Sequence, residues 1–137
     1  MSYLDTVKAL IEDWKRKDLD AVANYVTDDL VYFYAAGQAP INGKKAFRAF
    51  LETIKEHQQQ PAWRIKRSAE SVNTLFVEGV DDYVNPAGHH IQTPYVGIYE
   101  FRDGKISAWR DYFDFELLKK METGEAPNEH YQALAKA

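Results

Sequence analysis

Residues 109–114 have the sequence WRDYFD, in which a carboxylate interrupts a run of large apolar side chains suited to a buried strand. The side chains of a strand alternate between its two faces, so Trp109, Asp111 and Phe113 are predicted to share one face. An ionised carboxylate beside two aromatic rings is costly unless it is paired, hydrogen-bonded or protonated. Asp111 is therefore the first candidate for a functional residue, and Trp109 and Phe113 are candidates to line its surroundings.

Four long strands are predicted in the second half of the chain. Apolar and polar residues alternate there, and turn signals occur at Asn73, 85–88 and 102–105. The predicted strands span 63–71, 75–84, 91–101 and 106–113. Their order and spacing are typical of an antiparallel meander.

Helical periodicity precedes these strands. A first amphipathic helix is predicted from its regularly spaced apolar residues, Tyr3, Val7, Leu10, Ile11 and Trp14. Asp18 is a candidate N-cap for a second helix that buries Leu19 and Val26, after which residues 30–34 are expected to form a strand. Asn42 is a candidate N-cap for a third helix, which would bury Phe47, Phe50 or Leu51, and Ile54.

The C-terminal segment is predicted to be helical as well. A helix is expected from Asp114 to about Glu122, ended by Gly124, and the tail that follows is expected to add one or two turns. No internal repeat or linker divides the sequence.

This order of elements predicts an α+β fold in a single domain over residues 1–137. The helices and the strands bury their apolar faces best when a curved antiparallel sheet wraps around the N-terminal helices as a cone. The mouth of such a cone is suited to a small, mainly apolar molecule. Asp111 is predicted to project into it.

Composition excludes several classes of function. The net charge is −4 and basic residues are scattered, so neither nucleic acid nor a membrane surface is an expected partner. The chain has no cysteine, and its four histidines have no recognised metal-ligand spacing, so no metal and no cofactor are expected. The N-terminus resembles no signal peptide, and a cytoplasmic location is expected.

A second acid lies in the predicted strand 75–84. Gly79, Asp81 and Tyr83 share one face, and Asp82 lies on the other. If Asp81 faces inward, it meets Asp111 in one pocket, where two carboxyls with different protonation states can act as general acid and general base.

Each of these candidates has a structural alternative. Asp81 can be a solvated residue at the rim of the sheet, since acids are mostly exposed. Asp111 can belong to an ion pair with an arginine, namely Arg48, Arg64 or Arg67. Tyr32 and Tyr34 can offer hydroxyls to a ligand or serve only as core.

Four segments of the second half of the chain resemble limonene epoxide hydrolase. They are EGVD at 78–81, PYVGIYEF at 94–101, RDGKI at 102–106 and WRDYFD at 109–114. That family belongs to the cone-shaped superfamily of nuclear transport factor 2, ketosteroid isomerase and the SnoaL-type polyketide cyclases. The resemblance implies that Asp111 activates water, that Asp81 protonates the opening epoxide, and that Tyr32 holds the water. Tyr34 stands where the family has asparagine. A homodimer is also implied.

Gly79 departs from the family pattern, because an arginine that bridges the two acids belongs there. Glycine supplies neither charge nor donor. The freed space is expected to admit a larger ligand. The interpretation favoured by the sequence is a hydrolase of the limonene epoxide hydrolase type, and two alternatives stay open. One is a polyketide cyclase or ketosteroid isomerase that uses Asp111 alone, and the other is a ligand-binding or dimerising module without chemistry.

Overall fold

The computed structural model describes residues 1–136 and contains one six-stranded, mostly antiparallel sheet with the strand order β2-β1-β6-β5-β4-β3. The strands are β1 (Val26–Phe33), β2 (Ile41–Asn42), β3 (Arg64–Ser71), β4 (Thr74–Val84), β5 (His90–Arg102) and β6 (Lys105–Tyr112). The helices are α1 (Tyr3–Lys15), α2 (Leu19–Ala23), α3 (Lys44–Ile54), α4 (Phe115–Glu122) and α5 (Glu129–Lys136).

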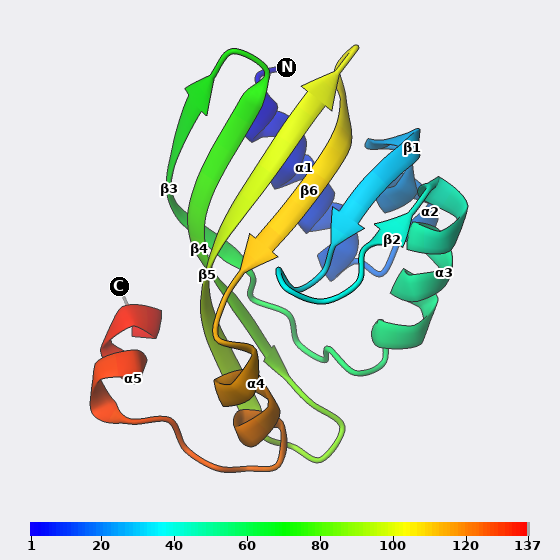
Figure 1. Ribbon diagram of the computed structural model, residues 1–137. Coiled ribbons are helices and arrows are strands. Elements are labelled where there is room, and N and C mark those ends of the chain that lie inside the picture. The colour runs from blue at the N-terminus through cyan, green and yellow to red at the C-terminus, as the bar shows by residue number, and fades with distance from the viewer. Residues whose placement is uncertain (137) are drawn as a thin grey trace.

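The predicted cone-shaped α+β architecture is confirmed. The sheet is curved and does not close into a barrel, and α1 crosses behind its strands (Figure 1). The core lies between this concave face and the N-terminal helices, where Leu10 of α1 and Phe47 of α3 join Tyr99 and Trp109 of the sheet. All four long strands begin and end within one residue of their predicted bounds.

The first strand differs from its prediction. The second helix ends at Ala23, and β1 already begins at Val26, which was predicted to belong to that helix. The Ile106 N–H donates to the Tyr25 carbonyl, and Val26 then pairs with Ile106 in parallel orientation. A tertiary contact with β6 thus extends the strand toward its N-terminus, beyond what local sequence indicates.

The predicted cap of α3 is also wrong. Asn42 belongs to β2 and pairs with Val31, while Gly43 is the N-cap of α3 and has φ of +93°. The Gly43 N–H donates to the Leu30 carbonyl over 2.7 Å, which ties the start of the helix to β1. The chain needs a left-handed residue to leave β2 here, and glycine adopts that conformation without strain.

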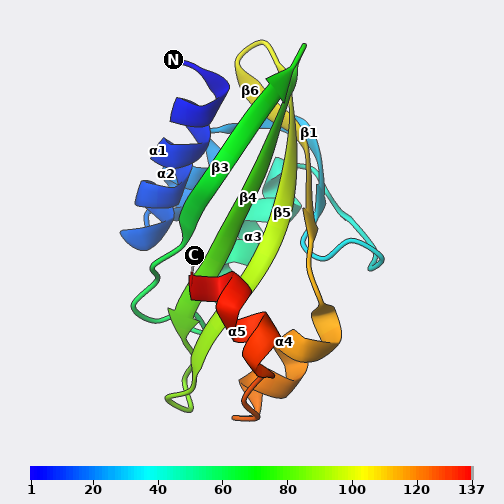
Figure 2. The same cartoon turned by 90° about the vertical axis from the view of Figure 1, so that its left-hand side faces the viewer.

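The C-terminal helices close the lower end of the sheet. The Asp114 side chain accepts a hydrogen bond from the Leu117 N–H and caps α4 as predicted. Figure 2 shows α4 and α5 together beside the lower parts of β4 and β5. Arg64 of β3 holds the end of α5 by donating to the Ala135 carbonyl over 2.5 Å. None of the helices in residues 1–136 has the length and apolar character needed to cross a membrane.

Candidate active site

A pocket lies between the concave face of the sheet and the N-terminal helices. It holds roughly 680 Å³ of space free of protein atoms, part of it in the open mouth. Aromatic side chains form most of its wall, namely Trp14, Tyr32, Tyr34, Phe47, Trp63, Tyr95, Trp109 and Phe113. Its polar groups come from Asp81, Asp111, Gln58 and Thr93, together with the tyrosine hydroxyls. An apolar wall with a few convergent polar groups is typical of a small-molecule site.

Asp111 projects from β6 into this pocket, as the strand alternation predicts. Its Oδ1 accepts a hydrogen bond of 3.0 Å from the Trp109 indole N–H. Gly97 lies directly opposite on β5, and a Cβ there would stand 3.0 Å from the same oxygen. A side chain at position 97 would therefore crowd the Asp111 carboxyl.

Burial raises the pKa of Asp111 well above the usual carboxyl range. The hydrogen bond from Trp109 acts in the opposite direction, and the charge of Asp81 adds to the rise. Removing a carboxylate from water disfavours its charged form, and one indole donor does not replace a hydration shell. The environment of Asp111 therefore favours the protonated acid.

Asp81 is the inward-facing member of the acid pair on β4. It lines the pocket, and burial, followed by the charges of Asp82 and Glu122, raises its pKa to about 7. The alternative of a solvated rim residue is wrong, because the side chain lies between the sheet and the helices. Two carboxyls with pKa values above the usual range thus share one pocket.

Asp82 faces the other side of the sheet and has its own partners. It accepts hydrogen bonds from Arg64 at 2.8 Å and Gln92 at 3.0 Å, and it pairs with His90 at 2.7 Å. Burial by itself raises the pKa of Asp82, but these bonds outweigh burial and the pKa lies below its usual value. The pKa values of the adjacent residues Asp81 and Asp82 are therefore shifted in opposite directions.

The predicted arginine partners of Asp111 pair elsewhere. Arg48 contacts Asp20 and Glu52, Arg64 contacts Asp82, and Arg67 contacts Glu78. Asp111 forms no ion pair with any residue of the described range 1–136. The structural alternative of a buried ion pair at Asp111 is therefore wrong.

Gly79 does not open the pocket to a larger ligand, contrary to expectation. A Cβ at this position would lie 2.5 Å from the Arg64 carbonyl oxygen and 2.9 Å from the ring and hydroxyl of Tyr95. Tyr95 itself lines the pocket, and its hydroxyl accepts a hydrogen bond of 2.5 Å from the Trp63 indole. A neutral tyrosine covers the site where the family has an arginine, and position 79 cannot bear a side chain without displacing β3 or Tyr95.

The predicted aromatic residues divide into two groups. Tyr32, Tyr34, Trp109 and Phe113 line the pocket. Burial raises the pKa of the Tyr32 and Tyr34 hydroxyls, so both remain neutral and can donate hydrogen bonds. Tyr83 lies outside the lining, because β4 continues past the pocket to α4. There its hydroxyl donates to Glu122 over 2.5 Å, so the structure does not bring Tyr83 together with the other predicted site residues.

Sequence reasoning missed several residues of the site. Gln58 and Trp63 belong to the segment between α3 and β3, which has no periodic pattern to indicate where its side chains point. Thr93 and Tyr95 share the concave face of β5, and strand alternation could have found both. Nothing in the sequence indicated a role for Gly97, because its importance depends on its pairing with Asp111 across the two strands.

Residues 7–109 match the model of the SnoaL-like domain. The chain belongs to this family. The resemblance to its superfamily of nuclear transport factor 2-like and limonene epoxide hydrolase-like proteins is thereby confirmed. No curated protein matches the sequence.

Solved structures share the fold of this SnoaL-like protein. An LEH-like epoxide hydrolase from M. tuberculosis is 25% identical, with a TM-score of 0.74 over 88% of each chain. A nuclear transport factor 2-like protein of unknown function from Burkholderia pseudomallei is 20% identical, with a TM-score of 0.80 over 90% of this chain and 99% of that one. A putative polyketide cyclase from Xanthomonas campestris is 20% identical, with a TM-score of 0.68 over 86% and 95% of the two chains.

The raised carboxyl pKa values predict a pH dependence of stability. Asp81 binds its proton more tightly in the folded protein, so stability falls as pH rises from the ordinary carboxyl value of 3.8 and levels off above about 7. Asp81→Asn removes the part of this decrease in stability that comes from ionisation of Asp81. Relative to the native protein, the variant should gain stability between about pH 5 and about pH 8, measured by urea unfolding. Asp28→Asn, at a side chain that is 97% exposed, is the control. An equal pH response of Asp81→Asn and native protein would contradict the raised pKa.

Proposed function

We propose that this SnoaL-like protein is a cofactor-independent acid–base enzyme that adds water to an epoxide of a small, mainly apolar molecule. The proposal rests on one observation, which is that Asp81 and Asp111 share an aromatic pocket in which burial raises both carboxyl pKa values. Epoxide opening needs an acid for the leaving oxygen and a base for the attacking water, and such a pair supplies both. The 25% identity with an epoxide hydrolase of the same fold supports this reaction class.

The environment of the two carboxyls assigns their roles. Burial raises the pKa of Asp111 well above the usual carboxyl range, so Asp111 keeps its proton, while Asp81 has a pKa of about 7 and is partly ionised at neutral pH. Because the Trp109 indole N–H can only donate, it makes Oδ1 of Asp111 an acceptor and leaves Oδ2 to donate. Asp111 is thus the acid and Asp81 the base, which is the reverse of the roles that the family resemblance implies.

The proposed step is balanced. The water oxygen forms a bond to an epoxide carbon as the bond from that carbon to the epoxide oxygen breaks. Asp81 takes a proton from the water, Asp111 gives its proton to the opening oxygen, and a proton passes back through the diol or solvent. Tyr32 and Tyr34 are proposed to hold the water through their neutral hydroxyls.

Substitution of either acid tests this step. Asp111→Asn and Asp81→Asn should each lower the turnover of cyclic epoxides about 10²- to 10⁴-fold, because each removes one proton transfer. The measurement is diol formation, with one oxygen incorporated from labelled water. Asp28→Asn, at a side chain that is 97% exposed, is the control. Undiminished turnover in Asp111→Asn would remove Asp111 from the reaction.

A cyclase or isomerase is the second candidate, favoured by the lack of a bridging arginine at Gly79. Protonated Asp111 and a tyrosine hydroxyl can stabilise an enolate oxygen, and Asp81 can move the proton at the adjacent carbon. In deuterated water this candidate predicts Asp81-dependent exchange at the carbon next to a ketone. Exchange without diol formation from any epoxide would favour it, whereas ligand-induced thermal stabilisation without either reaction would indicate a binding module.

We also propose that the protein forms a homodimer through the convex face of its sheet. Phe76, Val96 and Tyr112 expose apolar side chains there, and Val96 lies directly across from Tyr112. An apolar patch on a sheet face is typical of a subunit interface. Val96→Asp should yield monomers by sedimentation, whereas Val72→Asp, at a side chain on the β3–β4 turn that is 96% exposed, should not. A native monomer would overturn this proposal.

A further inference from the structure

Gln58 is a buried amide in the pocket wall that the proposed reaction does not use. It is 6% exposed and lies in the segment between α3 and β3, outside the strands that bear the carboxyls. The neighbouring Gln59 N–H donates to the Val84 carbonyl over 2.8 Å, which fixes this segment beside the end of β4. The pocket thus has a polar group contributed from outside the sheet, beside the end of α1.

The orientation of the Gln58 amide is determined by its partner. Trp14 donates its indole N–H to Oε1 of Gln58 over 3.1 Å. An indole nitrogen cannot accept a hydrogen bond, so the amide cannot turn over without losing this contact. Its nitrogen carries two donors, and neither has a protein acceptor within residues 1–136. Gln58 lines the pocket, so these two donors are available to a molecule bound there.

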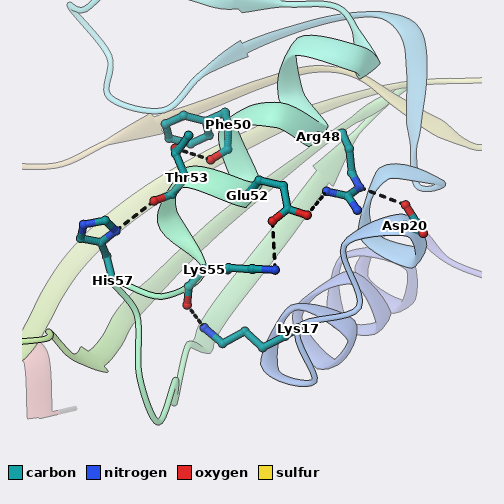
Figure 3. A network of polar contacts seen from close by, with 8 residues as sticks. All are labelled: Lys17, Asp20, Arg48, Phe50, Glu52, Thr53, Lys55 and His57. Atoms are coloured by element: carbon teal, nitrogen blue, oxygen red, sulfur yellow. Dashed lines mark hydrogen bonds and ion pairs between the residues drawn. The ribbon is translucent and has the colours of Figure 1, made fainter.

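The main chain of Gln58 is held as firmly as its side chain. Lys17, just after α1, donates through Nζ to the Gln58 carbonyl over 2.5 Å and to the Lys55 carbonyl. Figure 3 shows Lys17 reaching Lys55 at the end of α3, beside the cluster of Arg48 and Glu52. The same ammonium lies 5.1 Å from the centre of the Trp14 ring. The end of α1 therefore holds Gln58 at both its carbonyl and its amide.

We propose that Gln58 is a specificity residue whose side-chain N–H groups bind an oxygen acceptor on the ligand. The ligand is then an apolar molecule with a carbonyl, hydroxyl or ether oxygen in addition to the group that reacts at the carboxyls. The identity of the group that reacts at the carboxyls rests on the proposed function. The presence of a second oxygen on the ligand rests on Gln58 alone. A plain hydrocarbon epoxide leaves the amide unpaired and binds less well.

Binding of two unreactive probes tests this assignment. Cyclooctanone and cyclooctane have the same ring and differ by one carbonyl group, and both can be titrated by tryptophan fluorescence. Gln58→Glu keeps the acceptor for Trp14 and replaces the amide nitrogen by oxygen, and Gln58→Met removes both polar atoms. Gln59→Glu makes the same change one residue along, at an exposed side chain. Side-chain amide resonances of the native protein identify the group that contacts the ketone.

The ratio of ketone to hydrocarbon affinity should fall about tenfold in both Gln58 variants and stay unchanged in Gln59→Glu, as expected for the loss of one hydrogen bond. Cyclooctanone should also shift the Gln58 amide resonance, while cyclooctane should not. An unchanged ratio in both Gln58 variants, or failure of both probes to bind the native protein, would overturn the inference. A ketone preference that depends on Gln58, in a protein that opens no epoxide, would keep this inference and refute the proposed reaction.

Discussion

The burial of two carboxyl groups in one aromatic pocket is the constraint on which the site depends. Asp81 and Asp111 lose hydration, and each adds to the cost of ionising a neighbouring group. Burial disfavours the charged form of each carboxyl, and the charge of Asp81 raises the pKa of Asp111 further. The protonation state of the pair therefore follows mainly from the loss of hydration in the pocket.

The surrounding structure accommodates this constraint in two places. Gly97 leaves room for the Asp111 carboxyl on the neighbouring strand, and Trp109 gives one of its oxygens a donor. On β4, the alternation of the strand separates Asp81 from Asp82, so that one acid enters the pocket and the other meets Arg64 and His90 outside. A single strand thus presents one carboxyl with a raised pKa and one with a lowered pKa in consecutive positions.

The sequence predicts those parts of this arrangement that depend on local periodicity. The four long strands, the cap at Asp114 and the inward direction of Asp111 all follow from alternation and turn chemistry. The contacts of Tyr95 and Gln58 do not, because they depend on where distant segments meet. The same reason explains the early start of β1 at Val26, which is set by its pairing with Ile106. The sequence alone could not decide whether an arginine pairs with Asp111, because an ion pair has no sequence period.

Gly79 and Tyr95 are best understood as one linked feature. They lie directly opposite each other on β4 and β5, and the Tyr95 ring occupies the volume that any side chain at position 79 would need. Tyr95 presents a neutral hydroxyl there, and this hydroxyl accepts a hydrogen bond from the Trp63 indole. Because position 79 bears no charged side chain, burial remains the main cause that raises the pKa of both Asp81 and Asp111. In the proposed reaction, the assignment of Asp111 as the acid and Asp81 as the base depends on this environment, to which the packing of Gly79 against Tyr95 contributes.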